Sequence, residues 1–183
     1  ATPVRPPLKG IDLDGIFTLR NVEDTDRIKS YLQEHDVKSA VVVGGGFIGL
    51  EMAENLQEAG AKVSIVEMAN QVMAPIDFSM ASYVHRHLTD KGVDLYLEKG
   101  LDYFELVDHR IRVFLSNGEN LDADLVLLSI GVRPSTHLAT EAGIRVGRGI
   151  QVDEYLETSV PDIFAVGDAI EYPHPITGEN WLN

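Results

Sequence analysis

Three glycines stand at the spacing G-x-G-x-x-G in the stretch VVVGGGFIGLE. Gly44 permits a tight turn, Gly46 lets a diphosphate approach the backbone, and Gly49 lets the following helix pack closely. The unpaired N–H groups and the positive dipole end of that helix then face the phosphates. The pattern predicts a dinucleotide-binding bend.

A carboxylate follows the glycines at the distance that this fingerprint expects. Glu67 ends a second apolar run, Val63–Val66, about 20 residues beyond the glycines. At the adenosine ribose it would accept hydrogen bonds from both hydroxyls and repel a 2′-phosphate. We therefore predict NAD(H) as the cofactor, with NADP(H) less favoured. The alternative is a Rossmann-like turn that holds another adenosine ligand, such as a methyl donor, or no ligand.

The sequence offers few residues for catalysis or metal binding. The chain has no cysteine, which excludes a disulfide, a thiolate metal site and a cysteine nucleophile within it. The six histidines do not cluster, and His85 and His87 point to different faces of a predicted helix. We expect no metal site and no catalytic residue in this chain.

A strand, a helix and a second strand must position the glycines and the acid. The run Ala40–Val43 is short and β-branched, which is typical of a strand buried on both faces of a parallel sheet. A helical pattern follows, and Gly60 ends it as a C-terminal cap. Its inward face is predicted to consist of Ile48, Met52, Ala53, Leu56 and Ala59.

The flanking sequence predicts further elements of an α/β sheet. They are a strand at Ile16–Leu19, a helix at Val22–His35, a helix from Asp77 to Lys91 and a strand at Val93–Leu97. The second of these helices is expected to be capped by Asp77, closed by Gly92, and to face inward through Met80, Val84 and Leu88.

The pattern changes after residue 100. Segments 101–107, 110–115 and 120–122 alternate in polarity and are separated by turn signals, Asn117–Gly118 being the stronger. Leu125–Leu128 then returns as a buried parallel strand. We predict an α/β Rossmann-like parallel sheet with helices on both faces and a three-stranded antiparallel β-meander in place of one crossover helix.

Two further glycines follow predicted strands. Gly131 follows Leu125–Leu128, and Gly167 with Asp168 follows Ile163–Val166, which is predicted as a buried strand. Open α/β sheets bind ligands at the carboxyl ends of strands, where a glycine permits approach and a carboxylate accepts hydroxyl hydrogen bonds. A plain loop glycine is the alternative at Gly131.

Net charge and hydropathy exclude some classes of binding partner. The formal net charge is −14, which argues against nucleic acid and anionic membranes, since both require basic patches. No apolar run is long enough to span a bilayer, and the start lacks a signal-peptide pattern. The cytoplasm is the default location.

Three motifs together resemble the FAD/NAD-linked pyridine nucleotide–disulfide oxidoreductase family: VVVGGGFIGLE, LLSIGVRP and ETSVPDIFAVGDA. The stretches VEMANQVMAPID and DAIEYPHPITGE are most similar to its coenzyme A-disulfide reductase, NADH oxidase and persulfide reductase branch. The resemblance covers essentially the whole chain and implies two cofactors, NAD(H) and FAD.

The resemblance also implies roles for individual residues. Glu51 would lie near the nicotinamide, although an exposed first-turn acid is the alternative. Phe47 matches an aromatic position that covers the flavin, with ordinary packing as the alternative. Gly167 and Asp168 would hold FAD. The implied NAD contacts are Gly44, Gly45, Gly46, Phe47, Ile48, Gly49, Glu51, Glu67, Met68 and Gly131.

The family's N-terminal FAD fingerprint, the redox cysteine of this branch and the C-terminal dimerisation domain are not in this sequence. We therefore expect an excised part of a larger homodimeric enzyme: residues 1–15 as a connector from the FAD-binding half, 16–149 as the NAD(H)-binding domain, and 150–183 as a returning segment of the FAD-binding domain. Alone it should lack turnover, and it should not retain FAD stably.

The sequence is compatible with three functions. The first passes hydride from NADH to FAD and on to a disulfide, persulfide or oxidant through a cysteine outside this chain. The second is the same domain of a ferredoxin or rubredoxin reductase, which needs no cysteine. The third is a non-catalytic module that binds NADH.

Overall fold

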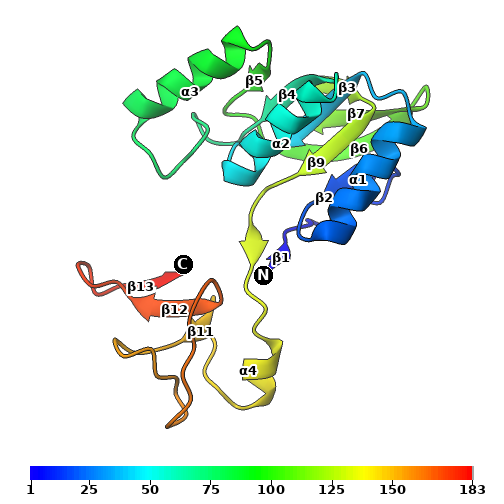
Figure 1. Cartoon of the computed structure of the whole chain (residues 1–183). Helices are drawn as coiled ribbons and strands as arrows, with labels where there is room; N and C mark the ends of the chain where they lie inside the picture. The colour runs from blue at the N-terminus through cyan, green and yellow to red at the C-terminus, as the bar shows by residue number, and fades with distance from the viewer. Residues whose placement is uncertain (183) are drawn as a thin grey trace. The chain divides into compact units, whose positions relative to one another are not determined.

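The computed structural model describes residues 1–182, and the chain divides into two compact units (Figure 1). The larger unit comprises Pro3–Gly131. The smaller comprises Ala1–Thr2 with the segment that begins at Val132. Within the described residues, no helix is both long and apolar enough to cross a membrane.

A five-stranded parallel sheet forms the centre of the larger unit, in the order β2-β9-β3-β4-β5. Its strands are β2 (Ile16–Thr18), β9 (Leu125–Leu128), β3 (Ser39–Val43), β4 (Lys62–Val66) and β5 (Asp94–Tyr96). All five predicted strands are thereby confirmed. The order reverses at β3, because the chain moves through β4 to β5 and returns on the other side as β9. That reversal is the point at which open α/β sheets bind ligands.

Three helices pack against one face of the sheet: α1 (Val22–Glu34), α2 (Phe47–Glu58) and α3 (Phe78–Asp90). Ile28 of α1 and Leu56 of α2 are buried there. Two glycines end α2 and α3 as predicted. Gly60 has φ 98° and Gly92 has φ 82°, and in each case the following N–H bonds to a carbonyl of the last turn.

The predicted inward faces of α2 and α3 need correction. Ile48 is 44% exposed and Met80 is 57% exposed, and Ala59 is exposed as well. Ala53 and Leu56 are buried as predicted, and Met52, Val84 and Leu88 pack against the same core while partly exposed. Gly49 on α2 and Ala81 on α3 are buried in addition. Hydrophobicity singles out the larger side chains, whereas close packing also buries small residues such as Gly49 and Ala81. Asp77 is the N-cap of α3 as predicted, but its side chain makes no capping bond.

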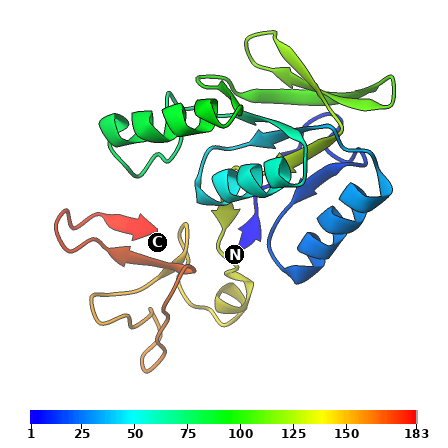
Figure 2. The same ribbon diagram turned by 45° about the horizontal axis from the view of Figure 1, so that its top comes forward.

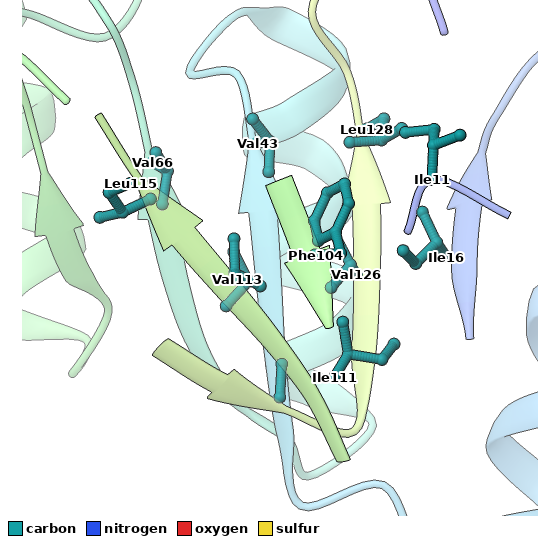
Figure 3. Packing of buried hydrophobic residues seen from close by; sticks show 12 residues of the cluster. Ile11, Ile16, Val43, Val66, Phe104, Ile111, Val113, Leu115, Val126 and Leu128 are labelled. Carbon is teal, nitrogen blue, oxygen red and sulfur yellow. The ribbon is translucent and has the colours of Figure 1, made fainter. Parts of the chain in front are cut away.

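The β-meander covers the opposite face of the sheet. It consists of β6 (Leu101–Val107), β7 (Arg110–Leu115) and β8 (Asn120–Ala123), paired antiparallel in that order. Figure 3 shows Phe104 and Val113 of the meander against Val43 and Val126 of the sheet. Figure 2 shows the meander and α2 on opposite sides of the parallel sheet. The fold class is confirmed, with the correction that α1, α2 and α3 share one face because the meander occupies the other.

The smaller unit contains α4 (His137–Glu141) and the sheet β11 (Ile150–Gln151), β12 (Ile170–Pro173) and β13 (Asn180–Leu182). The two-residue strands β1 (Thr2–Pro3) and β10 (Val132–Arg133) pair with each other. The prediction of a buried strand at Ile163–Val166 is wrong. Its one pairing among the described residues is an isolated bridge from Phe164 to Glu157, and Phe164 is 61% exposed. An apolar run becomes a buried strand only where neighbouring strands supply a ladder.

Asp124 fastens the start of β9 to the start of β3. Its carboxylate accepts from the backbone N–H groups of Lys38 and Ser39 at 3.0 and 2.9 Å, from Ser39 Oγ at 2.9 Å and from Arg110 Nε at 2.9 Å. Burial opposes ionisation, but the hydrogen bonds outweigh it and lower the pKa of Asp124.

We expect Asp124→Asn to lower the free energy of unfolding at pH 7 by about 2 kcal/mol, because it weakens several charge-assisted bonds. The folded-state pKa lies below the unfolded one, so this stability is present above the unfolded pKa and disappears as pH falls through the folded pKa. Urea unfolding of the two proteins should therefore converge in acid. Asp122→Asn, which breaks a partly exposed pair with Arg112, is the control, with an expected cost below about 1 kcal/mol. Equal effects of the two substitutions would contradict this role for Asp124.

Candidate functional site

The bend after β3 requires glycine at two of its positions. Gly44 has φ 107°, and a Cβ there would lie 2.3 Å from the Ser129 carbonyl oxygen. A Cβ at Gly49 would lie 2.0 Å from the carbonyl oxygen of Gly44. The predicted tight turn and close packing are both confirmed, although Gly49 packs against the bend itself rather than against a strand.

Gly46 differs from its neighbours, because the fold does not need a glycine there. Its φ is −79°, which any residue can adopt, and no heavy atom lies within 4 Å of an added Cβ. Gly46 is the N-cap of α2, where no side chain caps the helix and the first turn carries no acid. The bend therefore presents a helix N-terminus to open space, the arrangement that suits an anion.

A cavity of about 490 Å³ opens at this bend, within the larger unit. Of the predicted NAD contacts, it is lined by Gly44, Gly46, Glu67 and Met68. The remaining lining residues are Pro6, Leu8, Val43, Val66, Lys99, Gly100, Leu101, Ser129 and Ile130. The cavity thus lies at the carboxyl ends of β3, β4 and β9, where the topology places a ligand.

The Glu67 carboxylate is fixed at the cavity by two backbone donors. One oxygen accepts from the Gly45 N–H at 2.7 Å and the other from the Ala69 N–H at 2.8 Å. These bonds tie the end of β4 to the glycine bend. Each carboxylate oxygen has a second lone pair, so a hydroxyl can still bind there.

Two polar residues of the cavity were not singled out from the sequence. Ser129 donates from its backbone N–H to the Val43 carbonyl at 2.8 Å and from Oγ to the Gly44 carbonyl at 3.2 Å, which holds the bend against β9. Lys99 lies just beyond β5, and its backbone N–H donates to the Glu67 carbonyl at 3.0 Å. Ser129 belongs to the motif LLSIGVRP, in which only Gly131 was given a role, whereas Lys99 belongs to no motif and reaches the cavity through the pairing of distant strands.

Besides Gly45 and Gly49, which shape the bend, three predicted contacts on α2 do not line the cavity. Phe47 and Ile48 are 60% and 44% exposed in the first turn, so neither side chain is packed in the core of this chain. Glu51 lies beyond the first turn, which removes the first-turn acid interpretation. It lines a groove between α2 and α3 with Glu54 and His87.

The remaining predicted cofactor contacts are Gly131, which follows Ile130 in the chain, and Gly167 with Asp168, which lie in the smaller unit. Gly131 has φ 101°, with no heavy atom within 4 Å of an added Cβ, and directly follows Ile130 of the cavity. Gly167 has φ 86°, and Asp168 beside it is exposed. In residues 1–182, no group of three or more histidine, aspartate or glutamate side chains is arranged to hold a metal ion.

Comparison with known proteins identifies relatives along the whole chain. A family model described as pyridine nucleotide-disulphide oxidoreductase matches residues 1–179. An NADH oxidase of Methanocaldococcus jannaschii is 40% identical, with 100% of this chain and 41% of the relative covered. The chain therefore spans less than half the length of that relative.

Two solved structures share the fold. The reduced CoADR-RHD protein of Bacillus anthracis is 46% identical with a TM-score of 0.91, and the match covers 99% of this chain and 33% of that protein. A NAD-dependent persulfide reductase from A. fulgidus is 35% identical with a TM-score of 0.91, and the match covers 100% of this chain and 34% of that protein. Both matches leave most of the relative's chain outside the region that this sequence covers.

Proposed function

Because the chain belongs to the pyridine nucleotide-disulphide oxidoreductase family, whose members are FAD-dependent NAD(P)H oxidoreductases, we propose that it supplies the NAD(H)-binding domain of a larger flavoenzyme. The observation that carries this proposal is Gly46. Its backbone conformation and surroundings would accept a side chain, so the need for glycine comes from a ligand that must reach the backbone. A diphosphate at the N-terminus of α2 meets that need.

The rest of the cavity suits the adenosine half of the cofactor. Glu67 would accept the ribose hydroxyls while its backbone donors hold it in place. Met68 and Gly100 lie close together, since the Met68 sulfur is 4.0 Å from an added Cβ at Gly100, and they offer an apolar surface for the adenine. Gly131, Phe47 and Glu51 would lie toward the nicotinamide, and Gly167 with Asp168 would hold part of FAD.

An engineered relative supports the placement of Glu67. A solved NADPH oxidase, made by five substitutions in a water-forming NADH oxidase, carries a Gly→Ala and an Asp→Ala change at the spacing that separates Gly49 from Glu67. That protein is 27% identical to this chain and covers 97% of it with a TM-score of 0.86. The carboxylate at this position would therefore favour NADH over NADPH.

In this proposal the domain binds and orients NADH, and bound FAD supplies the electron chemistry. The residues of this chain grip the diphosphate and ribose, which places the nicotinamide for hydride transfer. A cysteine outside this chain would pass electrons to a disulfide, persulfide or oxidant. The names of the persulfide reductase and NADH oxidase relatives favour this class of substrate.

A ferredoxin reductase is the second candidate. A solved ferredoxin reductase from Rhodopseudomonas palustris is 30% identical with a TM-score of 0.91, and the match covers 45% of that chain. Such an enzyme would share the NADH site and differ in the electron acceptor. The full-length sequence distinguishes the two candidates, because a cysteine beside the flavin supports the first.

Calorimetric titration of this chain with NADH tests the proposed site. We expect one site with a dissociation constant between about 1 µM and 1 mM, within the range usual for enzyme ligands, and at least about tenfold weaker binding of NADPH, since Glu67 repels the 2′-phosphate. AMP should compete with NADH. A folded chain that binds no NADH, or that prefers NADPH, would contradict the proposal.

A further inference from the structure

Lys99 is the basic residue among those that line the cavity. Its backbone N–H bonds to the carbonyl of Glu67, so the lysine lies beside the acid that we assign to the ribose. Its side chain is only 25% exposed, and its ammonium lies 5.1 Å from the centre of the Tyr96 ring. The cavity that would receive a 2′-phosphate is therefore lined by a cationic residue, next in the backbone pairing to Glu67.

Glu119 neutralises that cation. It accepts from the Lys99 ammonium at 2.5 Å, and this bond lowers the pKa of Glu119. The acid stands on the turn between β7 and β8, from which Ser116 exchanges two hydrogen bonds with Gly100: its N–H donates to the Gly100 carbonyl at 2.8 Å, and its Oγ accepts from the Gly100 N–H at 3.1 Å. The turn is therefore anchored to the residue next to Lys99.

We propose that Glu119 is a specificity-determining residue, which discriminates against NADPH by holding Lys99 in an ion pair. The inference rests on the proposed function. It makes Glu119, on the meander, a second residue that determines specificity besides Glu67. Glu67 repels a 2′-phosphate directly. Glu119 neutralises the Lys99 ammonium, which would otherwise attract the 2′-phosphate. The corresponding ribose hydroxyl of NADH is uncharged, so its binding depends little on that ammonium.

We expect Glu119→Gln to raise the affinity for NADPH by about threefold to tenfold, the effect of freeing a partly exposed charge. The affinity for NADH should change less than about twofold, because the hydroxyl of its ribose is uncharged. The gain should shrink as salt is raised, since screening weakens the attraction between Lys99 and the phosphate.

The test is a set of calorimetric titrations with NADH and NADPH on the parent, Glu119→Gln, Lys99→Met and the double variant. The gain in NADPH affinity must vanish in the double variant. Asp122→Asn is the matched control, since its pair with Arg112 belongs to the same meander and neither residue lines the cavity. It should leave the ratio of the two affinities unchanged.

The outcomes separate the two proposals. If the parent binds no NADH, the proposed function fails. If the parent binds NADH but Glu119→Gln changes both cofactors equally, or keeps its gain without Lys99, then the specificity role of Glu119 is wrong. NADH binding by each variant also confirms that the variant is folded.

Discussion

Gly46→Asp is expected to weaken NADH binding at least about a hundredfold while the chain keeps its fold. The side chain would enter the space that is free of protein atoms within 4 Å of the Cβ. There it would cap α2, which has no side-chain cap, and place a negative charge where the diphosphate must lie. A hundredfold loss corresponds to about 2.7 kcal/mol, which steric exclusion and charge repulsion can together supply.

In Gly46→Asp, the affinity for NADH should fall while the free energy of unfolding does not. Because aspartate is a good N-cap, the free energy of unfolding should stay equal or rise by a few tenths of a kcal/mol, roughly the difference between aspartate and glycine at that position. Gly46→Ala should bind NADH about tenfold more weakly, because its methyl group occupies space that the diphosphate needs but adds no charge. Urea unfolding and NADH titration measure the two quantities on the same samples.

Gly44→Ala provides the contrast, because it should damage both quantities. The bend there has φ 107°, and an added Cβ would lie 2.3 Å from a backbone oxygen, so we expect a cost of at least about 2 kcal/mol in stability. If Gly46→Asp bound NADH as well as the parent, the diphosphate would not lie at this bend.

The core of this fold could be predicted from the sequence because its signals are local. Val41, Val42 and Val43 are buried on both sides, as their uninterrupted run predicts, and Gly60 ends its helix where expected. The meander can be predicted because its strands alternate in polarity and Asn117–Gly118 favours a turn.

The errors come from packing, which a local pattern does not contain. Ile48 carries more hydrophobicity than Gly49, yet the glycine is buried because it must touch the bend. Phe164 and its neighbours have the composition of a buried strand without a ladder to join. Lys99 reaches the cavity only through strand order, so no motif could have indicated it, and Ser129 lies in LLSIGVRP but is not a residue type that the pattern assigns to a ligand.

Glu67→Arg is expected to invert the choice of cofactor, changing the ratio of NADPH to NADH affinity by about a hundredfold, or 2.7 kcal/mol. The substitution removes a negative charge that lines the cavity and introduces a guanidinium suited to a phosphate. It also removes the acceptor of the Gly45 and Ala69 N–H groups, so the affinity for NADH should fall as well.

Glu67→Gln separates the effect of charge from that of the backbone bonds. Its amide oxygen can keep one of the two backbone donors, but it no longer repels a 2′-phosphate. The NADPH to NADH ratio should therefore rise in the order parent, Glu67→Gln, Glu67→Arg, as measured by titration with both cofactors. A loss of NADH affinity with no change in this ratio would mean that Glu67 serves only to hold the glycine bend, and the ribose would then have to lie elsewhere in the cavity.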